Sequence, residues 1–544
     1  MTHIIVALSG PVCSGKSTLA AGLVSRYGAT HVSTRELLQA RAAASGHQGL
    51  IERRALQEFG ERLDQTTSGR WVADDLRPLV NAAPLGGVVL IDAVRVPEQL
   101  DALRREFGRR IWHLHVETSS LAELERRYAA RAGGPGPVVE LADYAQVQSN
   151  PTEAKVPALA RLADIVLDTF RDTPADVLVR CAARLGLLAD LGERLVDVLV
   201  GGEYGSEGKG NIAYYLAPEY DLLVRVGGPN AGHTVPSDVP YIHRSLPSGT
   251  QSNLSARLVI GPGAVLNVDV LMKEIRDCGV GANRLSIDPQ AMVITAGDVA
   301  AETELKTTIG STGEGVGEAS ARRILGRSAG DASILAAAVP EFAPYVRSTA
   351  EVLAEAYADR SRILLEGTQG TGLSLFHGTY PFVTSRDTTV AGTLSEAGIS
   401  PRRVRRALMV CRTYPIRVGG NSGPIGQSKD LTWDEIAARS GIPAAEISER
   451  GSVSGNRRRV AEFDWLMLRR SAELNGVTDV ALTFADYLDV KNRDAYRYDQ
   501  LQPDTIRFVE EVEQVAGAPV SLIATNFSRR SVIDRRDWRG RITG

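Results

Sequence analysis

The feature that most constrains the fold is a glycine-rich turn that directly follows a short apolar run, and it occurs twice. The run Ile4 to Leu8 leads into residues 10–17, and the run Val196 to Val200 leads into residues 201–210. Such a turn between a strand and a helix lets backbone N–H groups surround phosphate groups. The 544-residue chain therefore begins a nucleotide-binding fold at two places, and its length exceeds that of one ordinary domain.

Short apolar runs rich in β-branched residues alternate with helical stretches along the sequence, which is typical of a mostly parallel sheet covered by helices on both faces. We expect an α/β chain with two nucleotide-binding domains: a three-layer domain over residues 1–188 and a larger, mostly parallel sheet domain over residues 195–544. The join is expected within Leu185 to Leu195, where no run of Pro or Ser forms a linker.

Composition excludes several classes of protein. The formal net charge is −3, with 43% apolar and 23% charged residues, which is unlike a nucleic-acid coat or a polybasic membrane binder. The four cysteines are far apart without a C-x-x-C pair, which argues against a disulfide framework or a zinc site. No apolar run approaches membrane-span length. We expect a cytoplasmic protein that binds neither nucleic acid nor membranes.

The first glycine-rich turn, Gly10-Pro-Val-Cys-Ser-Gly15-Lys16-Ser17, fits the pattern G-x-x-x-x-G-K-[ST] in full. Gly10 and Gly15 allow the backbone to wrap around phosphates, Lys16 reaches the β and γ oxygens, and the Ser17 hydroxyl is a ligand for Mg²⁺. This turn predicts a nucleoside triphosphate site that uses Mg²⁺.

The acceptor side of this first site is less specific. Asp92 ends an apolar run and is expected to orient the Mg²⁺ shell or an attacking hydroxyl, while Arg35 and Arg95 are candidates for a phosphate. Arg126, Arg127 and Arg131, next to Gly133 to Gly136, would suit a closing lid. Residues 1–188 resemble the small P-loop kinases that act on nucleoside monophosphates or dephospho-coenzyme A. The resemblance implies phosphorylation of a nucleoside or nucleotide.

The second turn lacks the Walker pattern, but it reads G-S-E-G-K-G over residues 205–210, and Gly227 to Thr234 reads G-G-P-N-A-G-H-T. Both resemble motifs of the adenylosuccinate synthetase family, W-G-D-E-G-K-G and G-G-x-N-A-G-H-T. Further blocks resemble the family in the same order, at residues 308–317, 366–370, 377–385 and 452–459. The resemblance implies ligation of L-aspartate to the 6-position of a purine monophosphate, driven by hydrolysis of ATP or GTP with Mg²⁺.

The resemblance also assigns roles to single residues. The implied catalytic residues are Ser206, Lys209 and His233, the last as the acid that contacts the transferred phosphoryl group. The implied triphosphate-binding residues are Gly205, Glu207, Gly208, Lys209, Gly210 and Asp486. The implied monophosphate-binding residues are Asn230, Thr312, Gln369, Thr384 and Arg327. Ser454, Arg457 and Arg458 are implied to hold aspartate, and Ser206 and the Gly232 carbonyl to hold Mg²⁺. The family also implies a homodimer, in which Arg323 or Arg327 crosses into the neighbouring site.

Three departures from the family pattern bear on the function. Ser206 replaces the aspartate that acts as general base, a loss worth about 10² to 10⁴ in rate. Asn456 replaces the first arginine of G-R-x-R, and Phe484 replaces the lysine of T-K-x-D, which leaves ATP or GTP open as donor.

Serine in this loop resembles the phage-type branch of the family, which makes N6-succinyl-2-aminoadenylate from dGMP. A small neutral hydroxyl leaves room for the 2-amino group of guanine. We therefore expect a guanine nucleotide, GMP or dGMP, as the substrate, in a bifunctional enzyme with a kinase domain. Two alternatives remain open: an IMP-dependent synthetase, and a protein that senses nucleotides without catalysis.

Overall fold

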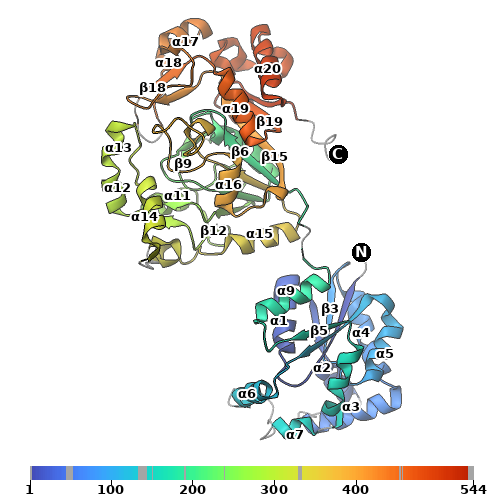
Figure 1. The fold of residues 1–544 in the computed structure, drawn as a ribbon. Helices are drawn as coiled ribbons and strands as arrows, with labels where there is room; N and C mark the ends of the chain where they lie inside the picture. Colours follow the sequence, from blue (N-terminus) through green and yellow to red (C-terminus); the bar gives the residue numbers. More distant parts are fainter. Residues whose placement is uncertain are drawn as a thin grey trace. The chain divides into compact units, whose positions relative to one another are not determined.

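The computed structural model describes residues 3–44, 53–132, 144–149, 151–188, 191–237, 239–328, 334–451, 455 and 457–536. The chain divides into two compact units, Met1–Leu188 and Ala189–Gly544 (Figure 1). Both are α/β units, so the expected fold class is confirmed.

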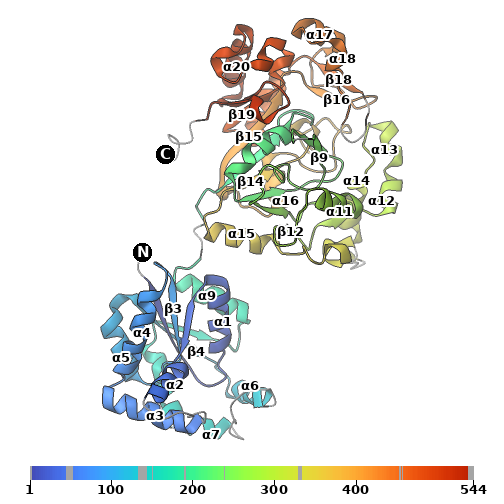
Figure 2. The same ribbon diagram turned by 180° about the vertical axis from the view of Figure 1, so that it is seen from behind.

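The first unit is built on a five-stranded parallel sheet in the order β2-β3-β1-β4-β5. Its strands are β1 (Ile4–Ser9), β2 (Thr30–Ser33), β3 (Val88–Asp92), β4 (Ile111–Glu117) and β5 (Ile165–Asp168). Helices α1 (Lys16–Tyr27) and α9 (Pro174–Arg184) cover one face, and α4 (Arg70–Ala82) and α5 (Pro97–Phe107) cover the other (Figures 1 and 2). The remaining helices are α2 (Thr34–Ala44), α3 (Arg53–Thr67), α6 (Leu121–Ala132), α7 (Tyr144–Gln148) and α8 (Pro151–Lys155).

The second unit contains a nine-stranded sheet in the order β12-β10-β7-β14-β6-β15-β19-β20-β21, parallel except for the last pair. Its strands are β6 (Val196–Gly201), β7 (Leu222–Arg225), β10 (Arg257–Ile260), β12 (Leu285–Ile287), β14 (Ile363–Glu366), β15 (Val404–Arg412), β19 (Asp479–Thr483), β20 (Val520–Ala524) and β21 (Val532–Asp534).

Helices pack on both faces of this larger sheet. Helices α15 (Thr349–Ala358), α16 (Val390–Ala397), α19 (Trp465–Asn475) and α20 (Pro503–Ala516) share one hydrophobic core, and α10 (Lys209–Leu216) and α11 (Val268–Asp277) share the other. The remaining helices are α12 (Ala296–Ala301), α13 (Thr303–Thr308), α14 (Val316–Leu325), α17 (Trp433–Ser440) and α18 (Ala444–Ile447). Small sheets pair β8 (His233–Val235) with β9 (Tyr241–His243), β11 (Val265–Leu266) with β13 (Met292–Val293), and β18 (Arg458–Ala461) with β16 (Ile416–Val418) and β17 (Asp430–Leu431).

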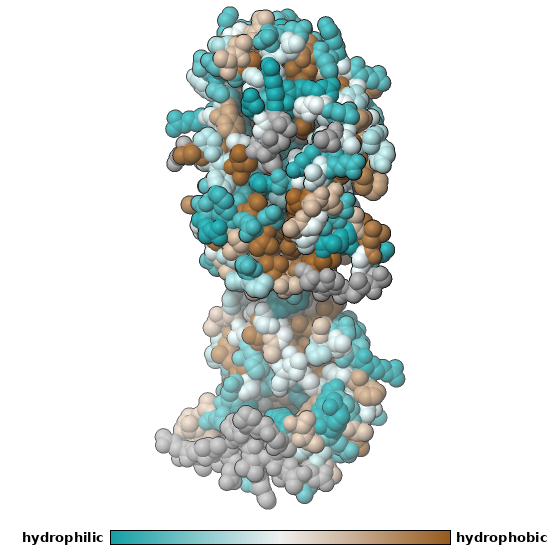
Figure 3. All heavy atoms as spheres, turned by 90° about the vertical axis from the view of Figure 1, so that its left-hand side faces the viewer, coloured by the Kyte–Doolittle hydropathy of each residue, from teal (hydrophilic) through white to brown (hydrophobic). Residues whose placement is uncertain are grey.

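One face of the larger unit carries an apolar patch. The view in Figure 3 looks at the side on which α12, α13 and α14 lie, and apolar side chains gather there among polar ones. Ile324 and Leu325, at the end of α14, are 61% and 79% exposed. Among the described residues, no helix is both long and apolar enough to span a lipid bilayer.

The central strands of the larger sheet should carry most of its stability. Leu365 of β14 is fully buried, so Leu365→Ala leaves a cavity and should cost about 2 to 5 kcal/mol. Hydrogen exchange of β6 and β14 peptides, measured as a function of urea, would report that loss for this sheet alone. Leu254→Ala is the matched control, because Leu254 is 74% exposed. Equal destabilisation by both substitutions would contradict the described core.

Candidate functional site

Each glycine-rich loop lies at the carboxyl edge of its sheet, between a strand and the N-terminus of a helix, which is where α/β proteins bind nucleotides. In the first unit the loop runs from β1 into α1. Gly10 has φ 142°, and a Cβ there would lie 2.0 Å from the Val116 carbonyl oxygen, so only glycine fits. Ser17, in the first turn of α1, is exposed, as a metal-binding hydroxyl must be.

Lys16 is buried in this loop. Its Nζ donates to the carbonyl oxygens of Gly10 at 2.8 Å and Pro11 at 2.6 Å, which places the ammonium group over the loop. Burial, followed by the nearby charge of Arg95, lowers the pKa of Lys16 to about 8. The lysine is therefore mostly protonated at neutral pH, but mildly alkaline pH removes its proton.

A cleft of about 750 Å³ opens in front of the loop. Lys16, Ser17, Asp92 and Arg35 line it together, which brings the predicted acceptor residues to the triphosphate site. Asp92 Oδ1 is buried and has no hydrogen-bond partner among the described residues, so a carboxylate oxygen remains for a ligand. Arg95 also lines the cleft but forms an ion pair with Glu153 of α8, so its charge is already compensated.

The three arginines expected to form a lid also line this cleft. Arg126 and Arg127 both donate to Glu123, at 2.7 and 2.8 Å. Arg127 also donates to the Thr169 hydroxyl at 2.9 Å, beside the phosphate loop. Residues 133–136, the glycines expected to let a lid move, lie outside the described residues.

In the second unit the loop runs from β6 into α10, and a buried carboxylate holds it. Glu207 Oε1 accepts the backbone N–H groups of Gly205 at 2.8 Å and Glu203 at 3.2 Å. Its Oε2 accepts Lys209 Nζ at 2.5 Å. Glu207 has no solvent exposure, so it lies beneath the loop and shapes it rather than facing a triphosphate from the solvent side.

Ser206 lies at the tip of this loop, exposed and in the left-handed region with φ 59°. Arg458 Nη2 donates to Ser206 Oγ at 3.3 Å, and Arg412 Nη1 donates to the Ser206 carbonyl oxygen at 3.1 Å. Arg412 is fully buried and pairs with Glu449 at 2.6 Å. Glu449 compensates the charge of Arg412, so the guanidinium group that suits the loop tip to an anionic ligand is that of Arg458.

His233 of β8 belongs to a buried network at the same sheet edge. Its Nδ1 contacts the carboxylate of Glu366, at the end of β14, and Ser248 N donates to the same carboxylate at 2.8 Å. Burial and Arg225 lower the pKa of His233 to about 4, while Arg225 and His233 outweigh burial and hold the pKa of Glu366 at about 2. Glu366 is therefore ionised and fixes His233 with Nε2 left for a ligand.

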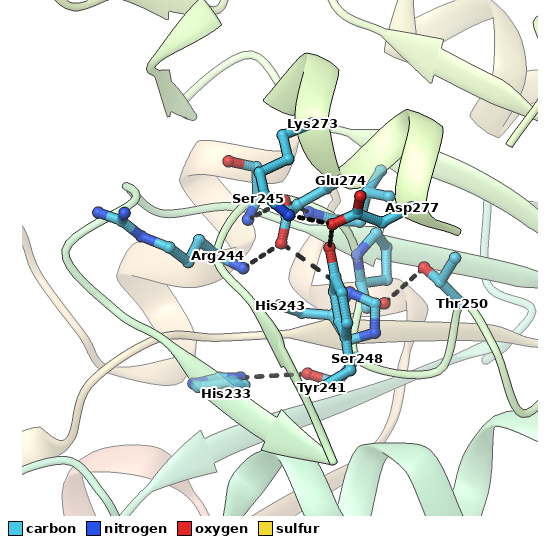
Figure 4. A network of polar contacts seen from close by, with 12 residues as sticks. His233, Tyr241, His243, Arg244, Ser245, Ser248, Thr250, Lys273, Glu274 and Asp277 are labelled. Carbon is cyan, nitrogen blue, oxygen red and sulfur yellow. Dashed lines mark hydrogen bonds and ion pairs between the residues drawn. The ribbon is translucent and has the colours of Figure 1, made fainter. Parts of the chain in front are cut away.

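The segment that supplies Ser248 is itself held by Glu274 of α11 (Figure 4). Glu274 accepts the backbone N–H groups of Ser245 at 2.8 Å and Leu246 at 3.0 Å, and also that of Arg244. Figure 4 shows this network between α11 and the β8–β9 hairpin. A second buried carboxylate thus positions the residues around His233.

The structure brings some of the predicted monophosphate-binding residues together. Gln369 Nε2 donates to Thr384 Oγ1 at 2.8 Å, and Gln369 Oε1 is buried with no partner among the described residues. Asn230 and Gly232 lie on the loop that leads into β8, and Thr312 lies between α13 and α14. Arg327 is exposed and donates to the Ile324 carbonyl oxygen at 2.8 Å, and among the described residues it has no hydrogen bond to any of these groups.

The remaining predicted residues have different surroundings. Asp486 is buried and pairs with Arg493 at 3.1 Å. Arg457 is exposed, and Arg458 begins β18, whereas Ser454 and Asn456 lie outside the described residues. Glu366, Arg225, Arg412, Glu449 and Glu153 were not predicted as site residues. The only sequence signal for them is a charged residue at the end of an apolar strand, as in Arg225, Glu366 and Arg412.

The donor groups in both sites suit Mg²⁺, which prefers oxygen ligands and usually binds through one or two protein groups plus phosphates. The first cleft offers the Ser17 hydroxyl and the unpartnered oxygen of Asp92. In the second unit, the Ser206 hydroxyl and the Gly232 carbonyl remain the ligands that the family resemblance predicts, and Ser206 is exposed at the loop tip. Among the described residues no cluster of three His, Cys, Asp or Glu side chains is arranged to hold a metal, so phosphate oxygens would supply the remaining ligands.

Comparison with known proteins identifies the second unit. The family model described as adenylosuccinate synthetase matches residues 198–335 and 330–493. Adenylosuccinate synthetase of Pyrococcus horikoshii is 37% identical over 350 residues, which cover 62% of this chain and 98% of that protein. The Thermococcus onnurineus enzyme is 38% identical with the same coverage.

Two solved structures match the same share of the chain. Succinoaminodeoxyadenylate synthetase (PurZ) of cyanophage S-2L, bound to dGMP and to dATP as an energy donor, is 28% identical with a TM-score of 0.53, and covers 63% of this chain and 96% of that one. Fully ligated adenylosuccinate synthetase from Plasmodium falciparum is 20% identical with a TM-score of 0.54, and covers 63% and 100%. The chain belongs to the adenylosuccinate synthetase family and carries a separate P-loop unit before the part that matches that family.

Proposed function

We propose that residues 195–544 ligate L-aspartate to C6 of a guanine monophosphate, with dGMP as the substrate, to give N6-succinyl-2-amino(deoxy)adenylate. The observation that carries this proposal is Ser206, a neutral hydroxyl at the tip of a loop whose other residues from Gly205 to Gly210 keep the family pattern. Of the two solved relatives above, the 28% identical one is described with dGMP bound. An aspartate at this position would crowd the 2-amino group of guanine, whereas serine leaves room and can accept a hydrogen bond from it.

The geometry supports a two-step reaction. A 6-oxo group leaves poorly, so it is first phosphorylated while the N1 proton passes to a carboxylate of the bound aspartate or to a water, and the aspartate amine then displaces phosphate. Lys209 and His233 neutralise charge that develops on the transferred phosphoryl oxygens, with His233 acting through Nε2 because Glu366 holds Nδ1. The approach of an anionic oxygen raises the proton affinity of His233, so its low pKa does not prevent it from acting as an acid. Mg²⁺ held by phosphate oxygens, Ser206 and the Gly232 carbonyl would supply further positive charge.

The guanidinium groups near Ser206 suit the amino acid substrate. Arg458 contacts Ser206 Oγ, and Arg457 precedes it on the same segment. Two arginines can hold the two carboxylates of aspartate and aim its amine at the purine.

The first test measures phosphate release with L-aspartate and each of IMP, GMP, dGMP and dIMP, crossed with ATP and GTP. It uses the Lys16→Ala chain, so that hydrolysis in the first unit does not contribute. We expect the highest rate with dGMP. A rate confined to IMP would refute the role given to Ser206, and no turnover with any of the four would favour a nucleotide sensor.

The second test changes the loop tip itself. Ser206→Asp should shift kcat/KM from guanine toward hypoxanthine nucleotides by about tenfold or more, because the carboxylate fills the space of the 2-amino group and restores a base. Ser206→Ala is the matched control, since it keeps the space and should keep the preference for guanine. An unchanged ratio in Ser206→Asp would count against the steric argument.

We also propose that residues 1–188 phosphorylate a nucleoside or nucleotide. The support is the single cleft that holds Lys16 and Ser17 together with an unpartnered Asp92 oxygen, which could accept the proton of an acceptor hydroxyl. Arg35 lines the same cleft and could hold an acceptor phosphate.

Lys16 should make triphosphate binding in this unit sensitive to pH. Only the protonated lysine attracts phosphates, and its pKa is about 8, so ATP affinity should be constant below pH 7 and fall roughly tenfold between pH 7 and 9. Calorimetry on the Lys209→Ala chain would measure this binding with the second site disabled. Lys16→Arg stays charged and should lose the pH dependence, and an identical decline in that variant would exclude Lys16 as the cause.

We further propose that the chain forms a homodimer through the face that carries α14, where exposed Ile324 and Leu325 lie between Arg323 and Arg327. Leu325→Glu should then yield monomers in light scattering, because a charge would be buried in the interface. Leu254→Glu, at another exposed leucine, is the control. A wild-type monomer would refute the proposal.

A further inference from the structure

We propose that the donor base in the synthetase unit is held mainly by stacking on Phe484, so that this site accepts adenine and guanine triphosphates alike. The inference rests on the proposed ligase function, since it concerns the phosphoryl donor of the same reaction. Phe484 is then the residue that binds either base. Arg493 is the residue that pairs with Asp486 and so keeps this carboxylate from selecting guanine.

Phe484 lies beside the phosphate loop. A Cβ on Gly208 would lie 3.3 Å from Thr483 Cγ2, and Thr483 Oγ1 donates to the Glu207 carbonyl oxygen at 2.7 Å. Phosphates at the N-terminus of α10 would therefore place the rest of a nucleotide across the carboxyl end of β19. Phe484 is the first residue after that strand, and Thr413 donates to its carbonyl oxygen at 2.7 Å.

The Phe484 ring has a fixed partner on one face. The Arg412 guanidinium lies 4.0 Å from the ring centroid. Arg412 cannot move easily, because it is fully buried and held by Glu449 at 2.6 Å. The ring also packs against Tyr487, with centroids 5.1 Å apart, but Phe484 as a residue is only partly buried, so part of its surface remains accessible to a base. Stacking on an aromatic ring depends little on which base is present, since every base has a π face.

The carboxylate that could discriminate between bases is already engaged. Asp486 is 7% exposed and accepts Arg493 Nε at 3.1 Å. Arg493 is also held by Glu446, at 3.3 Å. Guanine selection requires a carboxylate that accepts the N1–H and N2–H donors of the base, and here those donors would compete with a guanidinium. Guanine therefore gains little over adenine.

Equilibrium binding tests the inference without turnover. Kd values for ATP and GTP are measured by calorimetry on the Lys16→Ala chain, with the Lys16→Ala, Lys209→Ala chain as the blank. We expect the two Kd values to agree within about fivefold. A preference beyond about 30-fold for either base would overturn the inference. Because no monophosphate is present, this result does not depend on whether dGMP is the true substrate.

Two substitutions separate stacking from hydrogen bonding. Phe484→Leu should weaken ATP and GTP equally, by about fivefold or more, because it removes the π face but keeps an apolar side chain. Phe484→Trp keeps an aromatic face and should therefore bind ATP and GTP as tightly as the wild-type residue does. Arg493→Ala, at a side chain 30% exposed, should release Asp486 and favour GTP over ATP by about tenfold. Unchanged Kd values in Phe484→Leu, or an unchanged GTP to ATP ratio in Arg493→Ala, would overturn the inference.

Discussion

Glu207 carries a negative charge with no solvent exposure beneath the second glycine-rich loop. A buried carboxylate is costly unless it is paired and hydrogen-bonded, and here two backbone amides and the Lys209 ammonium group compensate it. The end of β6 and the segment after β14 also pack closely against this carboxylate. A Cβ on Gly201 or Gly370 would lie 2.7 or 2.2 Å from its carboxylate, so these positions must stay glycine for the loop to close. The shape of the phosphate site therefore depends on one compensated charge.

Buried carboxylates are compensated in the same way around His233. Glu366 and Glu274 are buried carboxylates, and each is satisfied by backbone amides or by a cation at the carboxyl edge of the sheet. Parallel strands deliver these groups to one edge, and helix N-termini add positive potential there. The edge is therefore rigid before any ligand arrives, which reduces the cost of ordering catalytic groups.

The sequence was informative where chemistry is local. The two loops, their strands and the blocks from residue 308 to residue 385 could be predicted because each function lies within a few consecutive residues. Pairings across long separations could not be predicted. Arg95 with Glu153, and Arg412 with Glu449, join segments that only the fold brings together.

The order of the larger sheet has a consequence for how the chain matures during synthesis. Strand β6, which leads into the Lys209 loop, pairs with β14 and β15, and residue 201 ends β6 while residue 363 begins β14. At about 5 to 20 residues per second, this strand, which is apolar except for Asp197, leaves the ribosome roughly 8 to 32 s before its first neighbour. The first unit, whose strands all precede residue 169, can meanwhile close. Nascent chains thus pass through a stage in which one half is finished and the other exposes an unpaired hydrophobic edge to chaperones.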